Sequence, residues 1–540
     1  MGRNTVAPQP GDVELSPRPK THSERMPNSR TSSFRSLQDA ISAKFRGIRE
    51  EGNFTLESLL SKAFDTTFLG CTKLFHTRTR FLVMILVLLC LASVWSNILS
   101  FNFAVICFIK EPLTGNQTGL LFNETTPVAT QFTLHERSYL TSAVAASALI
   151  ANFVVVSLVG RFGIRTVFTF LGLVSAAATF FMPTAVVLGF YYTLGARVAQ
   201  GIAFAANFPW TYYKQNGLFV SVLVAYVQFS PSLTMPISGA LCESQWKWPS
   251  VFYGHAIVST VLFILFGIFY RNSPKKHPFV GTLELNKIAV GKSSLSKDQL
   301  RQIPYGAILS TASVWAVWLA ACGNFVAANI MFLYSPVYMN KVLKFPVHQS
   351  GISSAIAPMA QFCLKLFAGF TSDKVRCLSE TNKLRVYNSI AFFGCATFLT
   401  ILAFAPTNLP YLCLAIFGCS AGSLGFTTGG FFKAAPLVSK HYSHFVTGNI
   451  SMGITATMLI VPFIVDGLTP NNAPEEWRYV FLVAAGILCA ADLLFVIMCS
   501  ANPASWTTDE FSREASSKRG HHSTVAHTSA KHLGPQMTIG

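Results

Sequence analysis

Long apolar runs recur along this chain, and they constrain its fold more than any other feature. Each run holds about 20 apolar residues, the length that a helix needs to cross the hydrocarbon core of a bilayer. Only 12% of the 540 residues are charged, about half of what a soluble domain carries. We therefore expect an all-α membrane protein with twelve transmembrane helices. The predicted spans are 81–108, 138–160, 166–186, 188–208, 216–240, 249–270, 309–332, 350–370, 387–405, 410–432, 446–466 and 478–499.

Basic residues indicate how the chain is oriented, because Lys and Arg collect in cytoplasmic loops near helix ends. They are frequent before the first span, between the second and third, in the long middle loop, and between the eighth and ninth. The alternate loops hold few of them. The predicted parts are a disordered cytoplasmic tail at 1–79, a six-helix bundle at 80–270, a cytoplasmic linker at 271–308, a second six-helix bundle at 309–502 and a disordered cytoplasmic tail at 503–540.

Two glycosylation signals give an independent indication of orientation. Asn116 and Asn123 each begin an Asn-x-Thr sequence, and both lie in the loop at 109–137. Such sites are modified outside the cell or in an organelle lumen. The charge rule places this loop on the same side, so we expect both asparagines to be glycosylated.

Other classes of protein find little support in the sequence. It holds no Gly-rich phosphate loop, no paired carboxylates in an apolar segment and no His or Cys spacing typical of a metal site. We therefore expect neither an enzyme nor a bound cofactor or metal. Nucleic-acid binding is not expected, because no folded basic domain is apparent. The 12 cysteines fall mostly inside spans and form no C-x-x-C pair, so we interpret them as small apolar packing residues.

Two short loops occupy equivalent places in the two halves. VGRFGIR (159–165) follows the second span, and GFTSDKVR (369–376) follows the eighth. They resemble the loop signature of the major facilitator superfamily, which usually has an acid where the first copy has Gly160. The alternative is two ordinary basic turns. The candidate gating residues are Gly160, Arg161, Gly369, Asp373 and Lys374.

Six further blocks, in matching order over about residues 80–505, resemble the anion:cation symporter family of that superfamily. The resemblance implies the major facilitator fold, in which two six-helix bundles rock around a site at the membrane midplane. It also implies secondary active transport of a small organic or inorganic anion, driven by protons, sodium or voltage. The blocks are MPISGALC (235–242), WPSVFYG (248–254), NSPKKHP (272–278), IPYGAILSTASVWAVW (303–318), SPVYMNKVLKF (335–345) and EEWRYVFLVAA (475–485).

The segment RVAQGIAFAANFP (197–209) is similar to the fourth-helix motif of this family. Helical spacing places Arg197, Gln200 and Phe204 on one face. An arginine inside a span costs about 3 kcal/mol on insertion scales, so it usually faces a wet cavity and meets an anion or an acid. We expect Arg197 to bind the anion; the alternative is that it snorkels or pairs structurally. The candidate substrate-binding residues are Arg197, Gln200, Asn97 and Asn324.

Several charges that are usual in the family are missing here. Phe204 stands where the motif carries a glutamate implicated in proton coupling, and Ile98 where relatives often carry an arginine. Thr141 and Asn324 replace a histidine and an arginine of the glutamate carriers, and Leu437 replaces an acid. We therefore expect weak dependence on a proton gradient and stronger dependence on voltage or sodium, although the resemblance leaves both sodium and the proton as candidate coupling ions. Glutamate is not the expected substrate.

Lys365, Lys433 and Asp492 are further charges that lie in predicted spans or at the end of one. Lys365 and Lys433 are each explained equally well by snorkelling to the cytoplasmic interface and by attraction of anions. Asp492 lies in the last helix, which is usually peripheral in this fold, so we interpret it as a structural hydrogen-bond partner.

The expected partners are a small anionic solute and the lipid bilayer, with the protein acting as a monomer. The expected location is the plasma membrane or a lysosomal or vesicular membrane. Because several family charges are lost, two alternatives stay open. One is a non-transporting scaffold or receptor, and the other is a facilitator for a neutral solute.

Overall fold

The computed structural model describes residues 56–108, 132–207, 224–273, 277–281 and 304–507. Residues 1–74 form one unit and residues 75–540 a second, larger one. The described residues contain helices and no strand. This agrees with the predicted all-α class and follows from the bilayer, where a helix satisfies its backbone polar groups within its own segment.

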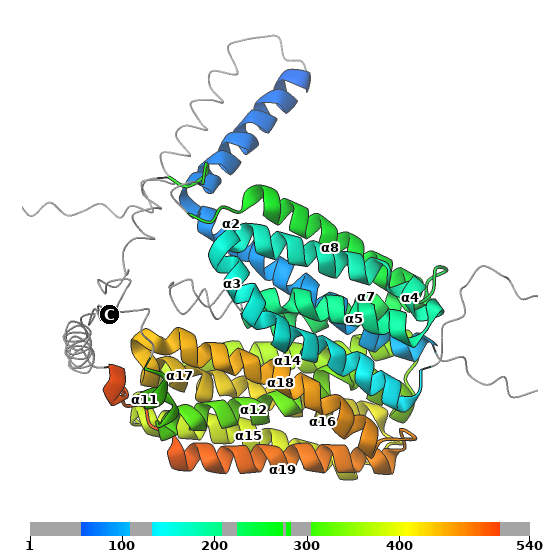
Figure 1. Cartoon of the computed structure of the whole chain (residues 1–540), viewed down its shortest axis with the longest axis vertical. Coiled ribbons are helices and arrows are strands. Elements are labelled where there is room, and N and C mark those ends of the chain that lie inside the picture. The colour runs from blue at the N-terminus through cyan, green and yellow to red at the C-terminus, as the bar shows by residue number, and fades with distance from the viewer. Residues whose placement is uncertain (1–55, 109–131, 208–223, 274–276, 282–303, 508–540) are drawn as a thin grey trace, which may run out of the picture. The chain divides into compact units, whose positions relative to one another are not determined.

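From residue 75 on, the first half of the chain forms one helical bundle (Figure 1). Its helix Leu134–Phe180 contains the second and third predicted spans, which meet at a kink where Gly163 has φ 78° and ψ 159°. Residues with a side chain rarely adopt this backbone conformation, so glycine is needed at the turn. The elements are α2 (Leu56–Phe108), α3 (Leu134–Phe180), α4 (Met182–Leu188), α5 (Phe190–Phe204), η1 (Ala205–Asn207), α7 (Tyr226–Glu243) and α8 (Pro249–Phe269).

The second half forms the other bundle (Figure 1). Its tenth predicted span is divided into α16, η5 and α17, with a break at Gly429 and Gly430. The elements are α11 (Tyr305–Leu309), α12 (Ala312–Leu333), α13 (Ser335–Val337), the π-helical η4 (Tyr338–Val342), α14 (Val347–Lys374), α15 (Glu380–Phe404), α16 (Pro410–Ser423), η5 (Leu424–Thr428), α17 (Phe431–Ser439), η6 (Lys440–Tyr442), α18 (Ser443–Leu468), α19 (Pro474–Met498) and η7 (Ser505–Thr507).

Among the described residues, nine helices are long and apolar enough to cross a membrane. One of them, α3, holds two predicted spans, while α5 with η1 and α7 correspond to the predicted spans at 188–208 and 216–240. The helices therefore fit the predicted arrangement of twelve spans in two bundles of six.

The ends of the fold differ from the sequence expectation. Helix α2 begins at Leu56, inside the segment expected to be a disordered tail. At the other end, the buried Trp506 donates a hydrogen bond from Nε1 to Thr311 Oγ1 at 2.9 Å, so ordered packing continues past residue 502. Residues 1–55 and 508–540, most of the linker, and both Asn116 and Asn123 lie outside the described residues.

A disulfide joins Cys107, in the last turn of α2, to Cys242, near the end of α7. Our interpretation of the cysteines as packing residues is wrong for this pair. The two residues are 135 positions apart, so no local spacing pattern could reveal that they meet. The other nine cysteines whose side chains are described are free.

Candidate functional site

Arg197 lies in the interior of the first bundle with no exposed surface. Its Nε donates to the carbonyl oxygen of Leu140 at 3.0 Å, and its Nη1 donates to the carbonyl oxygen of Ile98 at 3.1 Å. Nη1 also donates to Gln200 Oε1 at 2.9 Å, and the guanidinium lies over the ring of Phe101 at 4.7 Å. No carboxylate among the described residues pairs with it. The positive charge is therefore solvated by dipoles and an aromatic face, without a counter-ion.

Two more of the expected binding residues belong to the same cluster. Gln200 Nε2 donates to the carbonyl oxygen of Asn97 at 3.0 Å and to Thr179 Oγ1 at 2.8 Å. Asn97 Nδ2 in turn donates to Ser175 Oγ at 3.0 Å and to Ser259 Oγ at 3.2 Å. These bonds connect α2, α3, α5 and α8. We refer to Arg197, Gln200, Asn97 and these three hydroxyl residues as the arginine cluster.

Two buried polar atoms of the arginine cluster have no partner among the described residues. They are Arg197 Nη2 and Asn97 Oδ1. Leaving such a group unpaired is costly. Nη2 carries two N–H groups that are available for a further acceptor, and an anion is the acceptor that would also balance the charge.

Close approach of α5 and α3 depends on Gly201. A Cβ atom at this position would lie 2.0 Å from Ser147 Oγ and 2.2 Å from the carbonyl oxygen of Val144. Because Gly201 is the residue after Gln200 and one turn beyond Arg197, this contact sets the depth at which the arginine cluster sits in the bundle.

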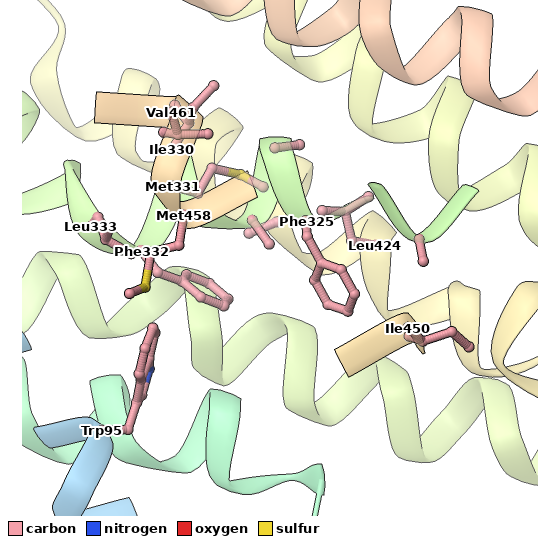
Figure 2. Close-up of a cluster of buried hydrophobic side chains, with 14 of the residues drawn as sticks. Trp95, Phe325, Ile330, Met331, Phe332, Leu333, Leu424, Ile450, Met458 and Val461 are labelled. Carbon is pink, nitrogen blue, oxygen red and sulfur yellow. The ribbon is translucent and has the colours of Figure 1, made fainter. Parts of the chain in front are cut away.

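Aromatic rings occupy the place of the acid that the family motif usually carries. Phe204 is 2% exposed, and its ring centroid lies 5.2 Å from that of Trp95. Figure 2 shows Trp95 extending from the first bundle toward Phe332 of α12. The apolar core is thus continuous between the bundles at this point.

Asn324 lies in α12, in the second bundle, and is 3% exposed. Its Oδ1 has no partner among the described residues, and no hydrogen bond joins it to the arginine cluster. The structure therefore brings together three of the four expected binding residues and leaves the fourth in the other bundle.

Asp492 makes hydrogen bonds to a neighbouring helix, the kind of contact that the sequence analysis expected of it. Its Oδ1 accepts from Asn388 Nδ2 and its Oδ2 from Ser389 Oγ, both at 2.7 Å. Asn388 Oδ1 also accepts from the backbone N–H of Phe431 at 3.3 Å. The buried carboxylate of α19 thereby anchors α15 and, through it, the start of α17.

The two loop motifs are fixed in different ways. In the second half, Lys433 Nζ donates to Asp373 Oδ1 at 2.8 Å and to Ser372 Oγ at 3.1 Å, which ties α17 to the end of α14. Lys374 lies over the ring of Phe370 at 4.1 Å.

In the first half, Gly160 and Arg161 are exposed, and the turn is held by Arg165, at the end of the motif, and by Asn272, which lies outside the motif. Arg165 donates from its backbone N–H to Asn272 Oδ1 at 2.9 Å and from Nε to the carbonyl oxygen of Gly267 at 2.7 Å. Asn272 follows α8 in sequence, and only its contact with this turn reveals its role.

Side-chain hydrogen bonds join the two bundles near the start of α3 and the end of α18. Ser138 Oγ donates to Asp466 Oδ2 at 2.6 Å, and Ser142 Oγ donates to the carbonyl oxygen of Leu459 at 2.9 Å. Tyr334 also hydrogen-bonds to Asp466, and Arg137 and His135 lie close enough to interact electrostatically with this carboxylate. These contacts lie at the opposite end of the helices from the two loop motifs.

Helices α7 and α14 join the bundles on the other side. At the same end, the backbone N–H of His348 donates to Glu243 Oε1 at 2.8 Å. Farther along the helices, Gln228 Nε2 donates to Gln361 Oε1 at 3.1 Å. The sequence did not predict a role for Asp466, Gln228 or Gln361, because a single polar residue in a span gives no sign of which helix it meets.

No cluster of three or more His, Cys, Asp or Glu side chains that could hold a metal ion occurs within the described ranges.

Known proteins resemble this chain in sequence and in fold. Residues 85–448 match the family model of the Major Facilitator Superfamily. Human sialin is 23% identical over 347 residues, which cover 62% of this chain and 70% of sialin. Human sodium-dependent phosphate transport protein 1 is 26% identical over 357 residues, which cover 62% of this chain and 74% of that protein.

Solved structures share the fold. The crystal structure of a bacterial homologue of the human lysosomal transporter Spinster superposes with a TM-score of 0.55 at 12% identity, covering 77% of this chain and 96% of that one. At this identity the likeness concerns the fold alone.

The packing at Gly201 generates a prediction. We expect Gly201→Ala to lower the apparent melting temperature of the purified protein, because the added methyl group would collide with Ser147 and the backbone of Val144. Overpacking of this kind costs about 1–3 kcal/mol. The matched control is Gly195→Ala in the same helix, where a Cβ meets nothing within 4 Å. Equal melting temperatures for the two variants would contradict the close packing of α5 on α3.

Proposed function

Because the chain belongs to the major facilitator superfamily, a superfamily of membrane transporters, we propose that it is a secondary active transporter that carries a small organic or inorganic anion by alternating access. Its curated relatives are named as transporters, and its fold is theirs. Proteins of this class need no cofactor. The similarity to sialin and to a phosphate transport protein favours an anion over the neutral solutes that other members carry.

The observation that carries the proposal is the uncompensated charge of Arg197. Burying a cation without a counter-ion is unfavourable, and intramembrane cations of this kind usually serve a substrate path. The dipoles around Arg197 occupy its Nε and Nη1 and leave Nη2 unused. We place the anion against Nη2, in a state of the cycle that opens the first bundle to it. Gln200 and Asn97 orient the guanidinium, and Asn324 supplies a polar group from the second bundle.

The contacts between the bundles support alternating access. The bonds at Asp466 and Glu243 hold together the ends that lie opposite to the loop motifs. They involve hydroxyl, carboxylate and backbone groups, which water can replace when the bundles separate. We assign this end to the non-cytoplasmic side, and the structure then represents the state in which that side is closed.

The charge rule supports this orientation, with both termini in the cytoplasm. The disulfide between Cys107 and Cys242 lies at the end assigned to the non-cytoplasmic side, and disulfides persist where the compartment is oxidising. The plasma membrane, a lysosome and a secretory vesicle all meet this condition. We propose a monomer in one of these membranes, glycosylated at Asn116 and Asn123.

We expect Arg197→Gln to lower uptake of labelled anions into proteoliposomes by at least about tenfold, which corresponds to about 1.4 kcal/mol of lost interaction. The panel includes inorganic phosphate and small carboxylates. Lys247→Gln, which removes an exposed cation outside the loop motifs, is the control and should retain uptake.

Unchanged uptake by a well-folded Arg197→Gln variant would exclude this residue as the anion contact. Thermal stabilisation by the same panel separates the alternatives. If no solute stabilises the protein, the scaffold function is favoured, and if charged and neutral solutes stabilise it equally, a facilitator for neutral solutes is favoured.

The absence of an acid at position 204 generates a separate prediction. Phe204 packs on Trp95 and cannot carry a proton, so we expect accumulation of the anion to follow an imposed membrane potential or sodium gradient. A pH gradient alone should have a small effect. The measurement is uptake into vesicles with each gradient imposed in turn, with protein-free vesicles as control. Steep accumulation driven by protons would contradict this coupling.

The contact between Ser138 and Asp466 is expected to keep one end closed. Ser138→Ala removes a hydrogen bond to a carboxylate. The loss of about 1 kcal/mol of stabilisation of the closed state should raise the population that is open at that end by about fivefold. The measurement is the labelling rate of a Ser142→Cys variant with a membrane-impermeant thiol reagent, in a background without the exposed Cys363, Cys377 and Cys419.

The matched control for this experiment is Ser157→Ala. Ser157 lies on the same helix, is exposed, and bonds only within it, to the carbonyl oxygen of Phe153 at 3.2 Å. Labelling at equal rates in the Ser138 and Ser157 variants would contradict a closing role for the Asp466 contact.

A further inference from the structure

Lys365 lies well inside the membrane-spanning part of α14. The helix runs from Val347 to Lys374, so Lys365 is nine positions before the last residue of the helix. At 1.5 Å per residue, the backbone of Lys365 is about 14 Å from that end of the helix.

The face of α14 that carries Lys365 points into the protein. The exposed residues of this helix recur every three or four positions and so form a single stripe toward lipid. Lys365 lies about 150° around the helix from the middle of that stripe, by the rotation of 100° per residue. It shares its face with the buried Ser354, Gln361 and Ser372. The lipid stripe is Ile352, Ile356, Met359, Cys363, Leu366, Phe367 and Phe370.

The interior position of Lys365 separates the two explanations that the sequence left open. A lysine that snorkels lies on the lipid face and extends along it to the headgroups. Lys365 is half-buried on the opposite face. Gln361, one turn earlier on this face, accepts the hydrogen bond from Gln228 of the first bundle. Lys365 is therefore one turn away from the boundary between the two bundles.

No carboxylate neutralises Lys365 among the described residues. Its ammonium group lies 5.0 Å from the ring centroid of Phe432, and within the described ranges the side chain of Lys365 makes no hydrogen bond and no ion pair. Lys433 and Lys383 of the same bundle differ, because they pair with Asp373 and Glu380. An interior cation whose charged group contacts only an aromatic ring is a candidate for binding an anion.

Aromatic side chains continue outward from this cation. Phe432 stacks on Phe431 with ring centroids 4.3 Å apart, and Phe325 of α12 lies 6.4 Å from Phe432. A ligand whose anionic group meets Lys365 would therefore place the rest of its body against aromatic rings. Such surroundings stabilise the hydrocarbon part of a ligand and leave ligand hydroxyl groups without hydrogen-bond partners.

We propose that Lys365 is the contact of the second bundle for the transported anion, and that this anion is an organic one with an apolar body. The inference rests on the proposed transport function and specifies its substrate class. Arg197 and Lys365 then present one cation from each bundle.

The test measures binding of three probes to the purified full chain by calorimetry. Toluenesulfonate has a permanent charge and an apolar ring, methanesulfonate has the same charged group without the ring, and toluenesulfonamide has the ring without the charge. We expect toluenesulfonate to bind at least about tenfold more tightly than either of the others. Lys365→Gln should weaken its binding by about 10- to 100-fold, as for loss of a charge-assisted hydrogen bond. Lys365→Arg should retain it, as should the control Arg376→Gln.

Chemical protection of the unaltered protein tests the same point without a variant. Toluenesulfonate should slow modification of Lys365 by an amine-reactive reagent, measured by mass spectrometry, and leave the exposed Lys374 as reactive as before.

The outcomes distinguish this inference from the transport proposal. A dissociation constant for Lys365→Gln within twofold of wild type, or absence of protection, overturns the role of Lys365 even if anions are transported. Equal affinity for toluenesulfonate and methanesulfonate overturns the inference that the transported anion has an apolar body. If wild type binds none of the probes, the inference fails, whereas the transport proposal fails only if proteoliposomes take up no anion.

Discussion

The guanidinium of Arg197 is the interaction on which the first bundle depends. Its donors reach carbonyl oxygens of α2 and α3 while its backbone belongs to α5. Each carbonyl has two lone pairs, so it can accept from the arginine and keep its helical bond. One side chain thus links three helices inside the membrane, where the hydrophobic effect gives little driving force for helices to associate. The same arrangement leaves the charge unbalanced, and this is the basis of the substrate role that we propose for Arg197.

Much of the fold could be predicted from the sequence because the bilayer imposes its own length on each helix. The apolar runs located the spans, and the relation between Arg197 and Gln200 followed from helical spacing alone. The limits appear where two helices meet. Asp466 and Ser138 are 328 positions apart, and nothing local in either segment identifies the other. The pairing of Cys107 with Cys242 could not be predicted from the sequence for the same reason.

Substitutions relative to the family motif were visible in the sequence, but their structural effect was not. Phe204 could be recognised as a missing acid. The structure adds that its ring packs on Trp95 next to the second bundle, so an apolar contact stands where a titratable group would be. In the first loop, the missing acid at Gly160 is accompanied by a different bond, between Asn272 and the backbone of Arg165. Among the described residues, the turn of the second half is therefore held by an ion pair and the turn of the first half by hydrogen bonds without an ion pair.

The disulfide connects two helices of the same bundle and does not cross to the other. At the same end, the bundles meet through hydrogen bonds such as those of Asp466 and Glu243. The covalent bond is thus confined within one bundle, and bonds that thermal motion can break and remake lie between the two bundles. In the transport cycle that we propose, a reducing environment would soften the first bundle without freeing it from the second, whereas a single covalent link placed across the interface would stop that cycle altogether.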